Sequence, residues 1–156
     1  METNVFSDET IKILRKGGWF EGRSVDSSAW EKLLRKNGYP VHPVVTAFLQ
    51  EFGGLEFKNP NSPSRAADDW HFCVERAVES SFSETILEYY SKRAGHPLCL
   101  IGIASKGYLW LMMDETGQVY GGYDEEFFYL GRSGPEAIEK LRTGRPAERV
   151  PELPES

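Results

Sequence analysis

The sequence predicts an α+β protein: a mainly antiparallel sheet with three N-terminal helices, one mid-chain helix and a C-terminal helix. Three observations support this fold class. Apolar residues recur at helical spacing in three segments before residue 54 and in two later ones. Between Leu98 and Leu130, strand-like runs follow one another too closely for crossover helices, so neighbouring strands should be antiparallel. Glycine or proline marks most of the boundaries.

Five helices are predicted from capping residues and apolar periodicity. The first begins after Ser7 and has acidic residues in its first turn. Gly17 is expected to end this helix by adopting the left-handed backbone conformation. The second begins near Ser28, where Glu31 completes a capping box, and it ends at Gly38. The remaining three are expected from Pro43 to Gly53, from Ser83 to Ala94, and from Ser133 to Gly144.

Six strands are predicted between these helices. Residues 114–117 have the length of a hairpin loop, and the Asn-, Pro- and Ser-containing segment 58–69 is expected to be a mobile loop. Residues 1–144 should form a single domain, followed by an irregular tail at 145–156, which has three prolines and no periodicity. The expected strands are Leu55–Phe57, Trp70–Val74, Leu98–Ile103, Leu109–Met113, Gln118–Tyr120 and Phe127–Leu130.

Composition excludes several classes of protein. A net charge of −6 argues against direct binding to nucleic acid, which requires a basic surface. No apolar run is long enough to span a membrane, and no secretory signal is visible at the N-terminus. Cys73 and Cys99 both lie in apolar runs and are expected to be free thiols, although the sequence does not exclude a disulfide. These features predict a cytoplasmic protein.

The negative charge is concentrated in one part of the chain. Residues 107–131 contain five acidic residues and no basic one, whereas acids and bases nearly balance on either side. This stretch coincides with the predicted hairpins and also contains several tyrosines and phenylalanines. One interpretation is a patch that keeps the sheet soluble, and another is a surface for a basic partner.

The residues that would identify an enzyme are missing. His42, His71 and His96 lack metal-ligand spacing with one another or with either cysteine. The glycine pairs are not part of a phosphate-binding or dinucleotide-binding motif, and no Gly-x-Ser-x-Gly sequence occurs. The carboxylate pairs at 68–69 and 124–126 lie in polar loops without a predicted apolar pocket. We therefore expect no enzymatic activity, no cofactor and no metal.

A series of short segments occurs in a characteristic order along the chain, and the sequence Gly-Trp-x-x-Gly-Arg-x-Val-Asp at 18–26 is the most specific of them. The others are 47–55, 100–102, 111–120, 130–131 and 141–144. Taken in this order, from about Ile11 to Gly144, the segments resemble the third family of the SUKH superfamily, a group of bacterial immunity proteins.

The resemblance implies an α+β fold and a role in a bacterial polymorphic-toxin system. Family members are inhibitors that bind a cognate toxin domain, often a nuclease, and the family is not known for a catalytic site. Related members of the superfamily are adaptors or regulatory proteins, so an intracellular adaptor remains the alternative. An enzyme or small-molecule binder with an unrecognised pocket is a third possibility.

We expect the partner to be a toxin domain with a basic cleft, and we place the contact on the acidic hairpin region. Aromatic residues beside acidic ones suit a tight interface, and Tyr123 is the first choice because it lies in the Gly-Gly-Tyr-Asp-Glu-Glu turn. In contrast, Trp19 and Trp30 are expected to be core residues, and Arg23 and Asp26 to form a local ion pair. The predicted partner-binding residues are Tyr123, Asp124, Glu125, Glu126, Asp114, Glu115 and Tyr120.

Overall fold

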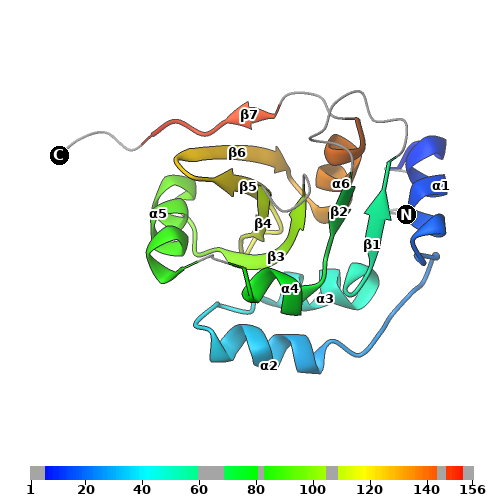
Figure 1. The fold of residues 1–156 in the computed structure, drawn as a ribbon, viewed down its shortest axis with the longest axis horizontal. Helices are drawn as coiled ribbons and strands as arrows, with labels where there is room; N and C mark the ends of the chain where they lie inside the picture. The colour runs from blue at the N-terminus through cyan, green and yellow to red at the C-terminus, as the bar shows by residue number, and fades with distance from the viewer. Residues whose placement is uncertain (1–5, 60–68, 81–82, 105–108, 144–146, 153–156) are drawn as a thin grey trace.

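The structure is a computed structural model that describes residues 6–59, 69–80, 83–104, 109–143 and 147–152. Within these ranges, seven strands form one antiparallel sheet in the order β1 to β7, so that each strand pairs with its neighbour in sequence (Figure 1). The strands are β1 (Glu56–Lys58), β2 (Asp69–His71), β3 (Cys99–Ala104), β4 (Leu109–Met113), β5 (Val119–Tyr123), β6 (Glu126–Gly131) and β7 (Glu148–Arg149). The helices are α1 (Asp8–Lys16), α2 (Ser28–Lys36), α3 (Pro43–Phe52), α4 (Val74–Val78), α5 (Glu84–Ala94) and α6 (Gly134–Thr143).

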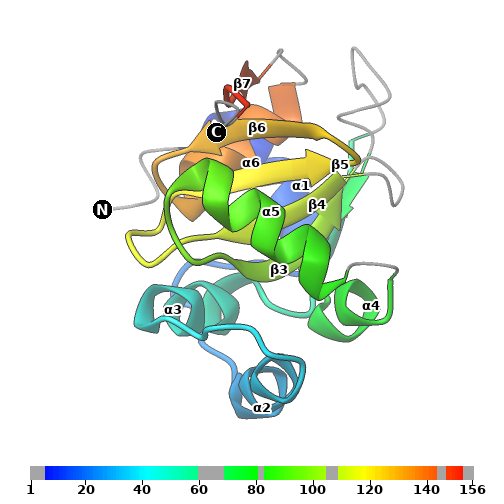
Figure 2. The same cartoon turned by 90° about the vertical axis from the view of Figure 1, so that its left-hand side faces the viewer.

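The predicted α+β fold class is confirmed, as are the consecutive antiparallel strands between Leu98 and Leu130. Helix α5 crosses one face of the sheet, whereas α1 and α6 lie behind it (Figure 2). Helices α2, α3 and α4 lie beyond β3, and α2 is the outermost of the three (Figures 1 and 2). The N-terminal helices and α5 therefore cover different parts of the sheet.

An aromatic cluster forms much of the core between the N-terminal helices and the first strands. The Trp19 side chain is only 2% exposed, and its ring lies 5.7 Å from Phe6 and 6.3 Å from Phe52. Phe48 and Phe72 extend the cluster with a T-shaped contact at 4.8 Å. The prediction that Trp19 is a core residue is confirmed. Trp30 is half-buried and packs against the core.

Two predicted segments differ from the structure, and a third is not described by it. The apolar run Trp70–Val74 divides into β2 and the first residue of α4, because the strand ends at His71 and a short helix begins at Val74. The tail is not wholly irregular, since β7 pairs Arg149 with Phe128. The expected mobile loop falls mainly on residues 60–68, which lie outside the described residues.

Two local predictions around α1 and α2 are also wrong. Gly17 has a right-handed φ of −82°, and the left-handed residue is Gly18 with φ +110°. Arg23 makes no local pair with Asp26: its guanidinium donates to the backbone oxygens of Glu51 and Gly53 at 2.6 and 3.0 Å. Arg23 therefore satisfies carbonyl groups at the end of α3, which an α-helix leaves without intrahelical partners.

Asp26 has a separate role at the start of α2. It accepts hydrogen bonds from both the backbone nitrogen and the hydroxyl of Ser28, at 3.0 and 2.6 Å. The predicted capping box of Ser28 and Glu31 is absent, because Glu31 accepts instead from the Ser27 hydroxyl.

Candidate functional site

Apart from Tyr120, which lies within β5, the predicted partner-binding residues divide between two turns at opposite ends of that strand. One group lies at the β4–β5 turn, which begins at Asp114, and the other at the β5–β6 turn, which follows Tyr123. β5 has five residues, and at a rise of about 3.3 Å per residue a strand of this length is roughly 15 Å long. The two acidic groups therefore do not form one continuous surface.

The carboxylate of Asp114 organises the first turn from inside the protein. The side chain is completely buried, and its Oδ1 atom accepts hydrogen bonds from the Thr116 backbone and hydroxyl and from the Gln118 backbone at 2.7–3.1 Å. Burial alone would raise its pKa, but these hydrogen bonds and the nearby His96 together hold the pKa of Asp114 below its usual value. Asp114 thus stabilises the turn and presents no surface to a partner.

Tyr120 is also an interior residue. It is 5% exposed, its ring stacks on Phe127 at 5.2 Å, and its hydroxyl donates to Asp114 Oδ2 at 3.3 Å. Burial raises its pKa above the usual tyrosine value, so the hydroxyl stays protonated. Tyr120 and Asp114 are therefore interior residues and do not form part of an exposed contact surface.

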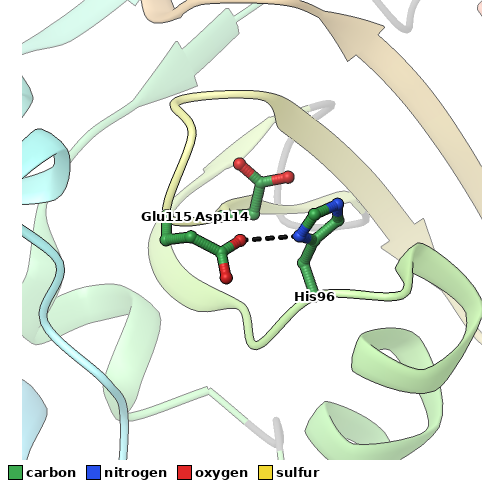
Figure 3. A group of neighbouring side chains, drawn as sticks. All are labelled: His96, Asp114 and Glu115. Atoms are coloured by element: carbon green, nitrogen blue, oxygen red, sulfur yellow. Dashed lines mark ion pairs between the residues drawn. The ribbon is translucent and has the colours of Figure 1, made fainter.

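Glu115 is exposed but already has a partner. Its Oε1 atom lies 2.7 Å from His96 Nδ1, and the side chains of His96, Asp114 and Glu115 gather between the first turn and the segment after α5 (Figure 3). This group could not be predicted from the sequence, because His96 lies on a different element from the two acids. One ligand atom from each residue lies within 4.8 Å of the others.

Histidine and carboxylate groups are metal ligands, so the three side chains are a candidate metal site. The donor set is unfavourable, because Asp114 Oδ1 already accepts three hydrogen bonds and Oδ2 accepts from Gln118 and Tyr120. Binding a cation through Asp114 would disrupt the turn that this side chain holds together. We therefore assign the group a structural role.

The second turn carries the remaining predicted residues, of which Tyr123, Asp124 and Glu125 are exposed and Glu126 is half-buried. Residues Tyr123–Glu126, here named the acidic turn, join β5 to β6 through the two loop residues Asp124 and Glu125. Tyr123 is 40% exposed, and its ring stacks on Phe128 at 6.1 Å. Glu126 pairs with Arg149 of β7 at 3.1 Å. No ion pair involves Asp124 or Glu125 within the described part of the chain.

The backbone of the acidic turn is fixed by α5. Asp124 has φ +50°, which is uncommon for a residue other than glycine. Its carbonyl oxygen accepts a hydrogen bond from the Tyr90 hydroxyl at 2.7 Å, and the Glu125 carbonyl accepts one from Arg93 Nη1 at 2.6 Å. The hydrogen bonds from α5 therefore hold the turn in a defined conformation, in which two carboxylates and one aromatic ring are exposed to solvent.

A second exposed aromatic residue was not predicted as a contact. Phe20 is 58% exposed, in the loop that follows α1. This loop is well anchored, because Trp19 Nε1 donates to Glu51 at 3.0 Å and the Arg23 backbone nitrogen donates to the Phe20 carbonyl at 3.1 Å. The sequence could not separate Phe20 from Trp19, since both are large aromatic residues in one short segment.

Outside the group of His96, Asp114 and Glu115, His71 and the two cysteines are the other candidates that the sequence offered, and burial affects all three. Burial lowers the pKa of His71 to about 4, and its Nδ1 atom accepts a hydrogen bond from the Cys73 backbone at 3.0 Å. Both cysteines are free, and burial raises the pKa of the Cys73 thiol and raises that of Cys99 to about 12. An open hollow of about 440 Å³ lies between the end of α2 and the start of α5, lined mainly by polar and charged residues.

None of the described helices combines the length and apolar character needed to cross a membrane. A comparison with curated proteins and one with solved structures each gave no match. A comparison with protein-family models matched residues 6–144 to the SUKH-3 immunity protein family. This match covers the described fold from Phe6, before α1, to the end of α6. Membership supports an immunity function and implies binding to a cognate toxin. The chain belongs to the SUKH-3 immunity protein family.

Proposed function

We propose that this protein neutralises a cognate toxin domain of a bacterial polymorphic-toxin system by binding it one to one and covering its active site. We further propose that the toxin is a nuclease and that the complex forms inside the cell that produces both proteins. The observation that carries this proposal is the acidic turn, which combines exposed carboxylates with an exposed aromatic ring.

Charge complementarity favours a nuclease over other toxins. A nuclease needs a basic cleft to hold its substrate, and an acidic inhibitor can occupy that cleft. Residues 107–131 carry five acids, but Asp114 is buried and Glu115 is paired with His96. Glu126 faces Arg149, so Asp124 and Glu125 are the carboxylates of this stretch that are open to a basic partner.

Tyr123 provides the apolar part of the proposed contact. Tyrosine is enriched among residues that dominate binding energy, because a rigid ring buries a large area at low cost in conformational entropy. The stacking of Tyr123 on Phe128 fixes the ring beside the two carboxylates. An arginine of the toxin could contact the ring face and a carboxylate of the acidic turn together.

The proposal is tested by co-expression with candidate nuclease toxin domains. The wild-type chain should restore growth against one of them, and the variant Asp124→Asn with Glu125→Lys should not. Asparagine is chosen at position 124 because it tolerates positive φ. The control is Glu9→Gln with Glu79→Lys, which makes the same change in net charge at exposed residues of α1 and of the segment after α4.

Each outcome has a clear meaning. Growth with the control but not with the turn variant supports the acidic turn as the contact. Equal protection by all chains would remove the acidic turn from the interface. Affinity capture that recovered several unrelated housekeeping proteins, rather than one basic toxin domain, would favour the adaptor role.

A further inference from the structure

Two buried residues of α5 hold the acidic turn in place. Tyr90 and Arg93 lie one helical turn apart, so they project from the same side of α5. Tyr90 donates to the carbonyl of Asp124 and Arg93 to that of Glu125. The carbonyl groups of both loop residues are thus bound by α5, while their carboxylate side chains remain exposed.

The position of Tyr90 is tightly constrained. Its side chain is completely buried, and its ring stacks on Phe127 at 4.9 Å with an interplanar angle of 8°. Gly122 allows this close approach, because a Cβ atom there would lie 2.7 Å from the Tyr90 ring. Gly122 therefore has a structural role: the absence of a side chain there lets α5 lie close enough to the sheet for Tyr90 to reach the turn.

Arg93 connects the acidic turn to the C-terminal segment. It is 6% exposed, and its guanidinium lies 5.5 Å from the ring centroids of both Tyr89 and Phe127. Besides Glu125, it donates to the hydroxyl of Tyr89 and to the carbonyl of Val150. Its hydrogen-bond acceptors in the described chain are thus neutral, so Arg93 is not neutralised by a carboxylate.

We infer that Tyr90 and Arg93 are positioning residues for toxin recognition, which hold the acidic turn in its binding conformation through its carbonyl groups without touching the toxin. This inference rests on the proposed function, because it takes the acidic turn as the contact. A positive φ is energetically unfavourable for an aspartate, so the backbone of the turn should change conformation when these hydrogen bonds are lost. Preorganisation of this kind lowers the entropy lost on binding.

The test uses Tyr90→Phe, which removes one hydroxyl and keeps the stacked ring. Arg93→Lys is the second variant, because it retains the positive charge but loses the planar fork of donors. The control is Tyr120→Phe, which removes a buried hydroxyl bonded to Asp114 at the other end of β5. Hydrogen exchange of the Glu125 and Glu126 amides is measured in the free protein, and binding kinetics are measured with the toxin domain identified by rescue.

Tyr90→Phe should speed exchange at the acidic turn and raise the dissociation rate roughly three- to tenfold, the factor that corresponds to one lost hydrogen bond. The salt dependence of association should stay as in the wild type, because no charge changes. Tyr120→Phe should alter neither exchange at the acidic turn nor dissociation. Arg93→Lys should likewise speed amide exchange at the acidic turn and raise the dissociation rate.

Unchanged exchange in both α5 variants would overturn the inference, as would faster exchange with unchanged dissociation. A failure of the proposed contact is distinguishable from these results. In that case Asp124→Asn with Glu125→Lys would bind the toxin normally, even where the α5 variants loosen the turn.

Discussion

At the scale of single residues, neighbours of the same chemical type have opposite roles. Trp19 is buried in the aromatic cluster, and the adjacent Phe20 is 58% exposed. Asp114 is buried and fully hydrogen-bonded, whereas the adjacent Glu115 is exposed. Residue type in a short segment could predict a core and a charged turn, but it could not assign these roles, because they depend on contacts made after folding.

The pair of adjacent aromatic residues gives a direct test of this difference. Trp19→Ala should lower the free energy of unfolding by roughly 3–5 kcal/mol, as for other large core truncations. Phe20→Ala should change it by less than about 0.5 kcal/mol, because little of its ring is buried. Chemical denaturation measures both. If Phe20→Ala abolishes toxin protection at unchanged stability, the toxin contacts the α1 end of the protein.

His71 should make stability depend on pH in a defined window. Its pKa is lowered to about 4 in the folded protein by burial, so below pH 6.5 the unfolded chain binds more protons than the folded one. The folded state should therefore lose up to roughly 3 kcal/mol as the pH falls from 6.5 to 4. His71→Asn should flatten this slope in denaturation measured across the window. A slope equal to that of the wild type would contradict the role of His71.

At the scale of elements, the five longer helices and the six strands between them were predictable, with some shifts in strand bounds, whereas α4 and β7 were not. The five predicted helices all exist, because each has nine or more residues with caps or apolar periodicity. Helix α4 has five residues and β7 has two, too few for either period to appear in the sequence. Both depend on tertiary contacts: α4 lies against β3, and β7 pairs with β6.

The exposed acidic turn of the candidate site was predictable, because glycine and charged residues separate two apolar runs. Its support by α5 was not, since Tyr90 and Arg93 lie more than 30 residues away in sequence. A buried arginine is unusual, and here its burial is compensated by backbone carbonyl groups and two aromatic rings that come from other parts of the chain or from the same helix.

Removal of β7 tests the structural role of the C-terminal segment. A chain ending at Ala147 loses the β6–β7 pairing and the Val150 carbonyl that accepts from Arg93. We expect its free energy of unfolding to fall by about 1–3 kcal/mol, because the strand pairing is lost and Nη2 of Arg93 loses its acceptor, in addition to Nε, which has no partner among the described residues. Arg149→Ala is the control: it breaks an exposed pair with Glu126 and should cost less than about 1 kcal/mol. Equal stability of the truncated and full chains would contradict this role.

At the scale of the whole molecule, excess negative charge and rigidity occur together. The net charge of −6 is distributed so that the open carboxylates of residues 107–131 lie at one end of the β5–β6 hairpin. That end is also supported by α5 and by the C-terminal segment. A fast and tight inhibitor is expected to have both features. The negative electrostatic field attracts a basic partner, and a rigid contact surface does not need to rearrange on binding.

The rate of association with the toxin domain should depend on the two open carboxylates of the acidic turn. Replacing Asp124 by Asn and Glu125 by Lys should slow association about tenfold or more at low ionic strength, because the two charges that steer the basic partner are lost. The difference should shrink as salt is added, since the Debye length falls to about 8 Å at physiological ionic strength. The charge-matched variant Glu9→Gln with Glu79→Lys should associate nearly as fast as the wild type at every salt concentration. Stopped-flow measurement over a salt series separates the two cases: parallel rates for both variants would show that overall net charge, rather than the acidic turn, attracts the toxin.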